Sequence, residues 1–290
     1  MTTRLSRPLR GVRVLSLALN LPGPAALLRL QAMGARCVKL EPPAGDPMRH
    51  YCPPAYAALH DGVRVLQADL KTEAGQRLLQ RELARSDVLL TSFRPSALAR
   101  LGLGWSRLHR LYPALNLVRI VGAAGAQAEI PGHDLTYQAE QGLIQGLNLP
   151  PTLYADMGGA LLASEAVLLA LMRRGRAGAG VQQEVALSEA AAWLALPRRW
   201  GLVQPRSAVG GGHAGYQVYA CRDGRVAVAA LEPHFAQALC AAAGLQAASM
   251  MDPALHEALA RWFAQQTRRR LDALAQRLDL PLHTLPPQDA

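Results

Sequence analysis

Aromatic residues and paired cysteines are scarce in this chain of 290 residues. Aromatics make up 5% of the sequence and no block of five Lys or Arg residues occurs, so a base-stacking surface for nucleic acid is disfavoured. The four cysteines form no C-x-x-C pair and have no histidine at ligand spacing. This pattern disfavours a zinc site or a disulfide framework, and it favours reduced thiols in a cytoplasmic protein.

Long hydrophobic runs and a recognisable targeting segment are also missing. The longest apolar run, MGGALLASEAVLLALM, contains Glu165 and is followed by RRGR, which favours a buried helix over a membrane span. The start, MTTRLSRPLRG, has no apolar signal-peptide core. We interpret it as an ordinary lead-in with a weak likeness to a transit peptide, and we expect no membrane partner.

The chain carries a formal charge of +10, and arginine supplies nearly all of it because Lys39 and Lys71 are the only lysines. The guanidinium fork binds phosphate or carboxylate groups bidentately and keeps its charge when partly buried. Hydrophobic residues make up 50% of the sequence and charged residues 18%, which predicts a folded protein with one large or two modest domains.

Strand-like and helix-like segments alternate in the first third of the chain. We expect strands at 12–19, 36–43, 64–70 and 87–93 and helices at 23–35 and 72–86. Strand, helix and strand repeated in this way predict right-handed crossovers and an α/β fold with a doubly wound, Rossmann-like parallel sheet. Ligands of such sheets bind at the carboxyl ends of the strands.

The sequence predicts two domains with a boundary near a glycine-rich linker. Residues 1–204 form the large α/β domain, and residues 205–290 form a smaller α+β domain. In the smaller domain the segments 216–221 and 225–231 flank an Asp-Gly turn, which predicts a β-hairpin, and two helices are expected after it.

The expected strand ends carry arginine rather than a dinucleotide fingerprint. NLPGP follows the first strand and is not G-x-G-x-x-G, so a nicotinamide enzyme is disfavoured although Glu41 lies at a suggestive distance. Arg49, Arg94 and Arg100 follow later strands. Each one alone is more often a solvated surface charge, but together they indicate an anionic ligand.

Two further segments place titratable groups at expected helix starts. In PGHDLTY, Asp134 is placed as the N-cap of a helix over 134–146, and His133 precedes it. A single loop histidine more often serves packing or lies on the surface. In LYADMGG, Asp156 is interpreted in one of two ways. It is either the N-cap of a helix, or it lies beside Gly158 and Gly159 at a helix start where backbone N–H groups approach a ligand closely and stabilise an oxyanion that develops on it.

From about Leu9 to its end the chain resembles the class III coenzyme A transferases (CaiB/BaiF type), which include formyl-CoA and carnitine CoA transferases and α-methylacyl-CoA racemase. The resemblance rests on successive blocks that occur in the same order: LRGVRVLSLA, GARCVKLEPPAGDPMR, ADLKTEAGQRLL, SDVLLTSFRPSALARLGLGW, PGHDLTYQAEQGL, YADMGGALLASEAVLLALMRRGRAGAG and YQVYACRDGRVAVAALEPHF.

The resemblance implies roles for individual residues. Asp156 matches the transferase nucleophile, which forms an aspartyl anhydride and then an aspartyl-CoA thioester. In the racemases the same aspartate is an acid/base opposite the histidine that matches His133, and a glutamate matching Glu232 partners that histidine. The positions expected to contact CoA are Arg49, Arg64, Phe93, Arg94, Arg100 and Tyr137.

The matched triple favours α-carbon racemisation of a 2-methylacyl-CoA, because removal of a proton α to a thioester needs a base on one face and an acid on the other. A CoA transferase, which needs only Asp156, and a non-catalytic CoA-binding relative remain as alternatives. The resemblance further implies CoA as part of the substrate with no tightly bound cofactor and no metal. It also implies an interlocked homodimer with each site between the large domain of one subunit and the small domain of the other.

Two features depart from the family pattern. Where members carry NRGKRS, this chain has HDGVRV, so Asp61 and Val63 stand in place of two cations that help to hold the CoA phosphates. We therefore expect CoA binding to depend on Arg49, Arg64, Arg94 and Arg100, or to be weaker or altered. Members also usually continue past the block that matches LPLHTLPPQDA with a segment that returns to the large domain, and the alternatives for this chain are a compact variant, a truncation or a protein that has lost activity.

Overall fold

Six short apolar runs form a parallel sheet in the first part of the chain. In the computed structural model, which describes residues 7–246 and 249–287, the contacts define two units, Met1–Ala195 and Leu196–Ala290. Most of the predicted lead-in therefore lies outside the described residues. The strands of the first unit are β1 (Arg13–Ser16), β2 (Arg36–Glu41), β3 (Arg64–Gln67), β4 (Val88–Thr91), β5 (Asn116–Val121) and β6 (Gln182–Ala186).

The strand order is β3-β2-β1-β4-β5-β6 and every neighbouring pair is parallel. This order confirms the predicted doubly wound α/β fold. The chain direction across the sheet reverses between β1 and β4, and a crevice forms at this switch point in such folds. Both strands are almost fully buried, as expected where helices cover both faces of a sheet.

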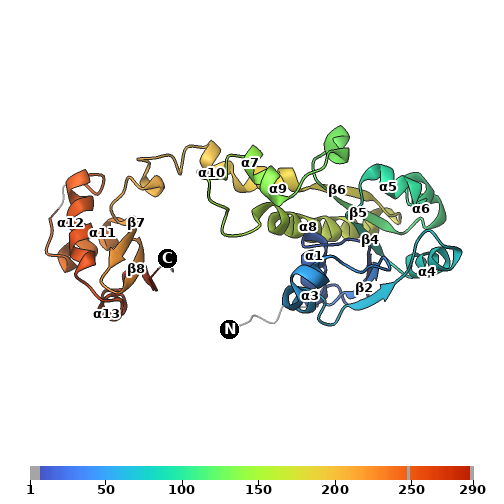
Figure 1. Cartoon of the computed structure of the whole chain (residues 1–290), viewed down its shortest axis with the longest axis horizontal. Coiled ribbons are helices and arrows are strands. Elements are labelled where there is room, and N and C mark those ends of the chain that lie inside the picture. The colour runs from blue at the N-terminus through green and yellow to red at the C-terminus, as the bar shows by residue number, and fades with distance from the viewer. Residues whose placement is uncertain (1–6, 247–248, 288–290) are drawn as a thin grey trace. The chain divides into compact units, whose positions relative to one another are not determined.

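Alternate side chains of the strands enter two separate cores. Val14 belongs to a cluster with α1 and α8, whereas Leu15 packs with leucines of α4, α5 and α6. Figure 1 shows α1 and α8 together, apart from the group of α4, α5 and α6. The helices of this unit are α1 (Pro22–Ala32), α2 (Met48–Tyr51), α3 (Pro53–Leu59), α4 (Glu73–Leu83), α5 (Pro95–Arg100), α6 (Trp105–Leu111), η1 (Gly125–Glu129), α7 (Asp134–Glu140), α8 (Tyr154–Ala177) and α9 (Leu187–Leu194).

Helix α8 is the one helix among the described residues that is long and apolar enough to cross a membrane by length and composition. It packs against α1, α9, β5 and β6, and its buried side carries small residues such as Ala163 and Ala170. Gly178 ends it in the left-handed conformation, with a φ of 73°. These contacts make α8 a core helix of the first unit, as its sequence indicates.

The second unit contains a small antiparallel sheet with its own core. The predicted hairpin is present, with Cys221 paired to Gly224 across a two-residue turn, and Phe263 lies in the middle of the core. The prediction of two following helices is wrong: three form among the residues that the structure describes, because Pro233, Pro253 and Thr267 each precede or open a helical run. The elements are α10 (Leu196–Arg199), η2 (Ala208–Gly210), β7 (Tyr216–Cys221), β8 (Gly224–Ala229), α11 (Pro233–Ala242), α12 (Pro253–Ala264), α13 (Arg268–Leu278) and β9 (Leu282–Leu285).

The four cysteines are all free thiols. Cys37 is buried in the sheet, and this burial raises the pKa of its thiol to about 12. A protonated, inaccessible thiol is a packing group rather than a nucleophile or a metal ligand.

Candidate active site

A cavity of about 160 Å³ lies at the carboxyl ends of β1, β4 and β5, where the fold places the switch point. Its wall combines strand ends with the first turns of α7 and α8. The lining residues are Leu19, Asn20, Pro22, Ser92, Arg94, Ile120, Val121, Gly122, Ala128, Ile130, Gly132, His133, Tyr137, Asp156 and Leu187. The structure thus brings together His133, Tyr137, Arg94 and Asp156, which the sequence had placed far apart along the chain.

Asp156 stands in the first turn of α8, which begins at Tyr154. Burial, and then the charge of Asp134, raise the pKa of the Asp156 carboxyl from 3.8 to about 7. A carboxyl with this pKa is present in both protonation states at neutral pH. It can therefore either accept a proton or donate one.

Asp134 does not cap its own helix, so the predicted N-cap role is wrong. Helix α7 begins at Asp134 and its N-cap is His133, whose amide donates to Thr136 Oγ1 at 3.2 Å. The buried Asp134 carboxylate instead accepts the amide N–H of Asp156 at 3.0 Å and a hydrogen bond from Gln138. Asp134 therefore joins α7 to the first turn of α8 and places a negative charge beside Asp156.

We expect Asp134→Asn to lower the pKa of Asp156, because the substitution removes the neighbouring charge and keeps an oxygen that accepts the Asp156 amide. The change is sterically mild, since Gln138 Oε1 has no partner among the described residues and can accept from the new amide after a flip. The pH dependence of turnover measures this. The limb assigned to Asp156 is expected to move to lower pH, and an unmoved limb would exclude Asp134 as a cause of the raised pKa.

The glycines beside Asp156 serve helix packing rather than ligand approach. A Cβ atom on Gly159 would lie 2.2 Å from Cδ2 of Leu187, and one on Gly158 would lie 3.2 Å from Cδ1 of Leu194. Both glycines therefore allow α8 and α9 to pack closely. The amide of Asp156 is already bonded to Asp134 and is not available to a ligand, and the oxyanion role of the remaining backbone at this helix start stays a prediction.

Tyr137 is buried in the cavity wall, and its hydroxyl lies against two glycines. A Cβ atom on Gly122 would be 2.1 Å from the hydroxyl oxygen, and one on Gly132 would be 2.5 Å away. Burial, followed by the charge of Asp156, raises the pKa of Tyr137. The phenol therefore stays protonated and is a hydrogen-bond donor at the same cavity as Asp156.

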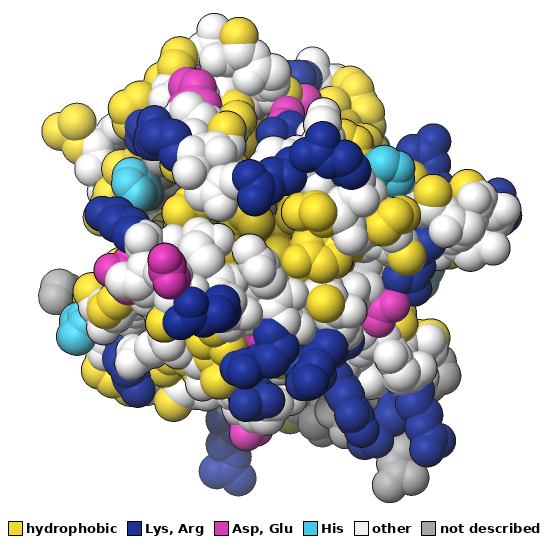
Figure 2. All heavy atoms as spheres, turned by 90° about the vertical axis from the view of Figure 1, so that its right-hand side faces the viewer, with side chains coloured by type: hydrophobic (Ala, Val, Ile, Leu, Met, Phe, Trp, Pro, Cys, Tyr) yellow, Lys and Arg dark blue, Asp and Glu magenta, His cyan; other side chains and the backbone are white. Residues whose placement is uncertain are grey.

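All four predicted arginines are exposed, and Arg94 is the one among them that lines the cavity. Arg94 is the N-cap of α5 and Arg100 is its last residue, and both contribute, after hydrogen bonds from Ser96, to the lowered pKa of Glu129. Arg49 lies in α2 with its guanidinium carbon 5.4 Å from the Tyr56 ring centre. Figure 2 shows several groups of cationic side chains, and few acidic ones, on the side of the molecule that carries α4, α5 and α6.

Three other predicted residues are not among the residues that line the cavity. Arg64 is exposed at the start of β3, and Phe93 packs against the leucine cluster formed with α4, α5 and α6. Glu232 is exposed and is the N-cap of α11 in the second unit. Its partnership with His133 stays a prediction. Val63, which replaces a family lysine, packs against the core on the α1 side of the sheet.

Asn20 and Ser92 are cavity residues that the sequence reasoning missed. Asn20 follows β1 with a φ of 62°, in the left-handed region. Ser92 follows β4, and its hydroxyl accepts the amide of Leu19 at 3.2 Å. Their positions shortly after the two strands at the switch point are the signal that indicates them, because residues that follow such strands line the crevice of the fold.

A doubly wound sheet with a polar, titratable cavity at its switch point defines an α/β protein of the coenzyme-binding class. Sequence comparison defines the family. The model of CoA-transferase family III matches residues 9–287, so the chain belongs to this family and is an enzyme of it. Members of the family act on CoA thioesters.

Relatives of two reaction types are similar to the chain. Human α-methylacyl-CoA racemase is 31% identical over 287 residues, which cover 90% of this chain and 73% of the racemase. The succinyl-CoA:D-citramalate CoA-transferase of Chloroflexus aurantiacus is 35% identical over 203 residues, covering 64% of this chain and 50% of the transferase. Among solved structures, a CaiB/BaiF family protein from Brucella suis aligns with a TM-score of 0.79 at 26% identity, covering 98% of this chain and 84% of that one.

Proposed function

We propose that this enzyme racemises the α-carbon of a 2-methylacyl-CoA by two-base proton transfer. The observation that carries the proposal is the single cavity lined by both His133 and Asp156, with the pKa of Asp156 near 7. A carboxyl with a pKa near 7 can both accept and donate a proton, which suits a reaction that must run in both directions.

In this reaction one group removes the α-proton and leaves an enolate, and the other group delivers a proton to the opposite face. The group that starts as base ends as acid, so either enantiomer is a substrate. The Tyr137 hydroxyl and the Arg94 guanidinium line the same cavity and are among the donors that could stabilise the enolate oxygen. Glu232 would orient His133, and Arg49, Arg64, Arg94 and Arg100 would bind the CoA phosphates.

CoA transfer between carboxylic acids is the second candidate. It is favoured by the comparable identity of the racemase and the citramalate transferase to this chain. In that reaction the ionised Asp156 attacks the thioester carbonyl and CoA thiolate leaves, and the thiolate then attacks the aspartyl carbonyl of the resulting anhydride, so that the donor acid leaves as a carboxylate and an aspartyl-CoA thioester remains. The acceptor carboxylate attacks this thioester and CoA thiolate leaves again, and attack of the thiolate on the acceptor's carbonyl in the new anhydride gives the product thioester and restores the Asp156 carboxylate. The reaction assigns no step to His133.

Incubation of a 2-methylacyl-CoA in deuterated water, with an unlabelled free carboxylate present, separates the candidates. Racemisation predicts a thioester that is one dalton heavier and a product of mixed configuration. Transfer predicts a new thioester of the added acid without deuterium. If neither product forms although CoA binds, the chain is a non-catalytic CoA-binding relative for this substrate class.

We propose that the protein forms a homodimer and acts in the cytoplasm. Several large apolar side chains are exposed on the first unit, among them Leu149, Met172 and Trp193, which is 68% exposed. Such a surface is typical of a covered interface. Light scattering is expected to give twice the chain mass of 31.1 kDa, and Trp193→Glu is expected to shift the mass toward the monomer. A monomeric wild-type protein would contradict the proposal.

A further inference from the structure

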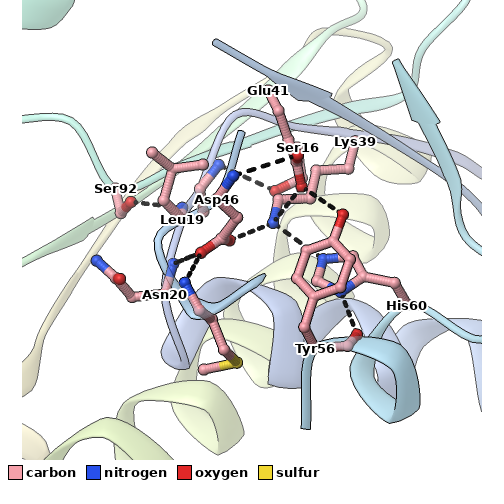
Figure 3. A network of polar contacts seen from close by, with 11 residues as sticks. Ser16, Leu19, Asn20, Lys39, Glu41, Asp46, Tyr56, His60 and Ser92 are labelled. Atoms are coloured by element: carbon pink, nitrogen blue, oxygen red, sulfur yellow. Dashed lines mark hydrogen bonds and ion pairs between the residues drawn. The ribbon is translucent and has the colours of Figure 1, made fainter. Parts of the chain in front are cut away.

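Lys39 is one of only two lysines in the chain and its side chain has no exposed surface. It stands near the end of β2, and its ammonium group contacts three different side chains. Nζ pairs with Asp46, lies 3.1 Å from Glu41 Oε1 and lies 2.9 Å from His60 Nε2. Figure 3 shows these contacts converging on the ammonium group. All three N–H groups of Lys39 are therefore used.

The three partners of Lys39 form a donor set that resembles a metal site. One atom from each of Glu41, Asp46 and His60 lies within 4.8 Å of the others. The ammonium of Lys39 already contacts all three residues and supplies the positive charge of the cluster. Because Glu41 is engaged in these contacts, it is not available to bind the ribose of a dinucleotide. This agrees with the absence of the G-x-G-x-x-G fingerprint after β1.

His60 completes the cluster as a neutral acceptor. Its Nδ1 lies 2.6 Å from the carbonyl oxygen of Tyr56, which can only accept, so Nδ1 carries the proton and Nε2 accepts from Lys39. Burial lowers the pKa of His60 and favours this form. The Tyr56 hydroxyl donates to Glu41 at 3.0 Å. Every charged member of the cluster is therefore paired, as burial requires.

Asp46 connects this cluster to two backbone segments outside it. Its carboxylate accepts the amide of Asn20 at 3.1 and 3.2 Å, and it accepts the amide of Met48 at 2.9 Å. Asn20 belongs to the cavity wall and has a left-handed backbone, which costs free energy unless its surroundings hold it. Met48 opens α2, which carries Arg49.

We propose that Lys39 and Asp46 are positioning residues for the reaction proposed above, on which this inference rests. The buried ammonium fixes the Asp46 carboxylate. Asp46 in turn fixes the backbone of Asn20 in the cavity wall and the amide of Met48 at the start of α2, the helix that carries Arg49. The cluster thus couples the shape of the reacting cavity to the placement of a cation assigned to CoA.

The test compares Asp46→Ala and Asp46→Asn with a matched control, Glu82→Gln. Asp46→Ala removes every contact of the Asp46 side chain. Asp46→Asn keeps a side-chain oxygen that can accept the amides of Asn20 and Met48, but it loses the negative charge that pairs with Lys39. Glu82 is also buried and also paired, but its partner Arg13 stands at the opposite, amino end of β1. The control therefore breaks a buried ion pair away from the cavity.

We expect Asp46→Ala to lower kcat about 100-fold, the order of loss that misplacement by about 1 Å causes, and to raise the KM for acyl-CoA. Asp46→Asn is expected to recover part of kcat because its oxygen still holds Asn20. Amide hydrogen exchange should accelerate at Asn20 and Met48 in Asp46→Ala. Glu82→Gln is expected to lose thermal stability with kcat, KM and exchange at those two amides unchanged.

Equal kcat and KM in Asp46→Ala and the wild type would overturn the proposal, as would equal exchange at Asn20 and Met48. If Asp46→Ala does not fold, Asp46→Asn decides by the same two readouts. If the wild-type enzyme neither exchanges the α-proton nor transfers CoA, the proposed function fails. Hydrogen exchange at the two amides still decides whether Asp46 holds the loop and α2.

Discussion

Asp156→Asn is expected to reduce both α-proton exchange and CoA transfer by about 10³-fold or more. In the first reaction the substitution removes one of the two proton-transfer groups, and in the second it removes the nucleophile. The amide side chain keeps the size of the carboxyl, and the backbone amide still donates to Asp134. The deuterium assay measures both reactions, and CoA binding by calorimetry serves as the control for folding. Retention of either activity would remove Asp156 from that reaction.

The same substitution is expected to stabilise the folded protein at pH 8 and to leave its stability unchanged at pH 4. The pKa of Asp156 is 3.8 in the unfolded reference and about 7 when folded. Between these values the folded state binds more protons than the unfolded state, so stability falls as pH rises through this window. Roughly 3 pKa units correspond to an upper limit of roughly 4 kcal/mol, and partial solvation reduces this to on the order of 1–2 kcal/mol.

Chemical denaturation at the two pH values checks the sign of this effect. A gain in stability at pH 8, together with lost activity, would mean that the buried Asp156 carboxyl lowers the stability of the folded protein but is needed for the reaction. If Asp156→Asn is instead less stable than the wild type at pH 8, burial does not raise the pKa of this group as the structure indicates. This stability measurement tests the raised pKa on which the acid/base role of Asp156 depends, and it requires no substrate.

Local sequence patterns were sufficient for most of the sheet and insufficient for its last strand. The apolar runs of β1, β2 and β4 predict strands because each is buried on both faces. β6 (Gln182–Ala186) has the sequence QQEVA, whose first three residues are polar. It forms a strand through its pairing with β5, where Arg119 and Glu184 make an ion pair at 2.8 Å. Such a cross-strand contact is invisible to a pattern read within one segment.

The candidate site, like the sheet, was predictable only where the signal lies within one segment of the sequence. The helix-start patterns and the family blocks pointed to His133 and Asp156, and both line the cavity. The capping rule assigned Asp134 to its own helix, since the rule considers only neighbours within a turn. Its actual partner is the amide of Asp156, 22 residues away, which only the packing of α7 against α8 brings near. The Lys39 cluster escaped prediction for the same reason.

His133→Ala is expected to lower α-proton exchange by about 10²–10⁴-fold, the usual contribution of a positioned acid/base. CoA transfer through Asp156 is expected to persist, because that reaction needs no second proton-transfer group on the opposite face. His109→Ala is the matched control. His109 is a partly exposed histidine that packs against Trp105 on α6, away from the cavity.

The pattern of losses distinguishes three roles for His133. Loss of exchange alone makes His133 the second proton-transfer group and supports racemisation. Equal loss of exchange and transfer makes it a positioning group. The imidazole exchanges no proton in CoA transfer, so a loss of transfer must come from a change in the shape of the cavity. If exchange in His133→Ala equals that of His109→Ala and the wild type, Asp156 works without this histidine. The two-base proposal is then wrong, and CoA transfer becomes the favoured reaction.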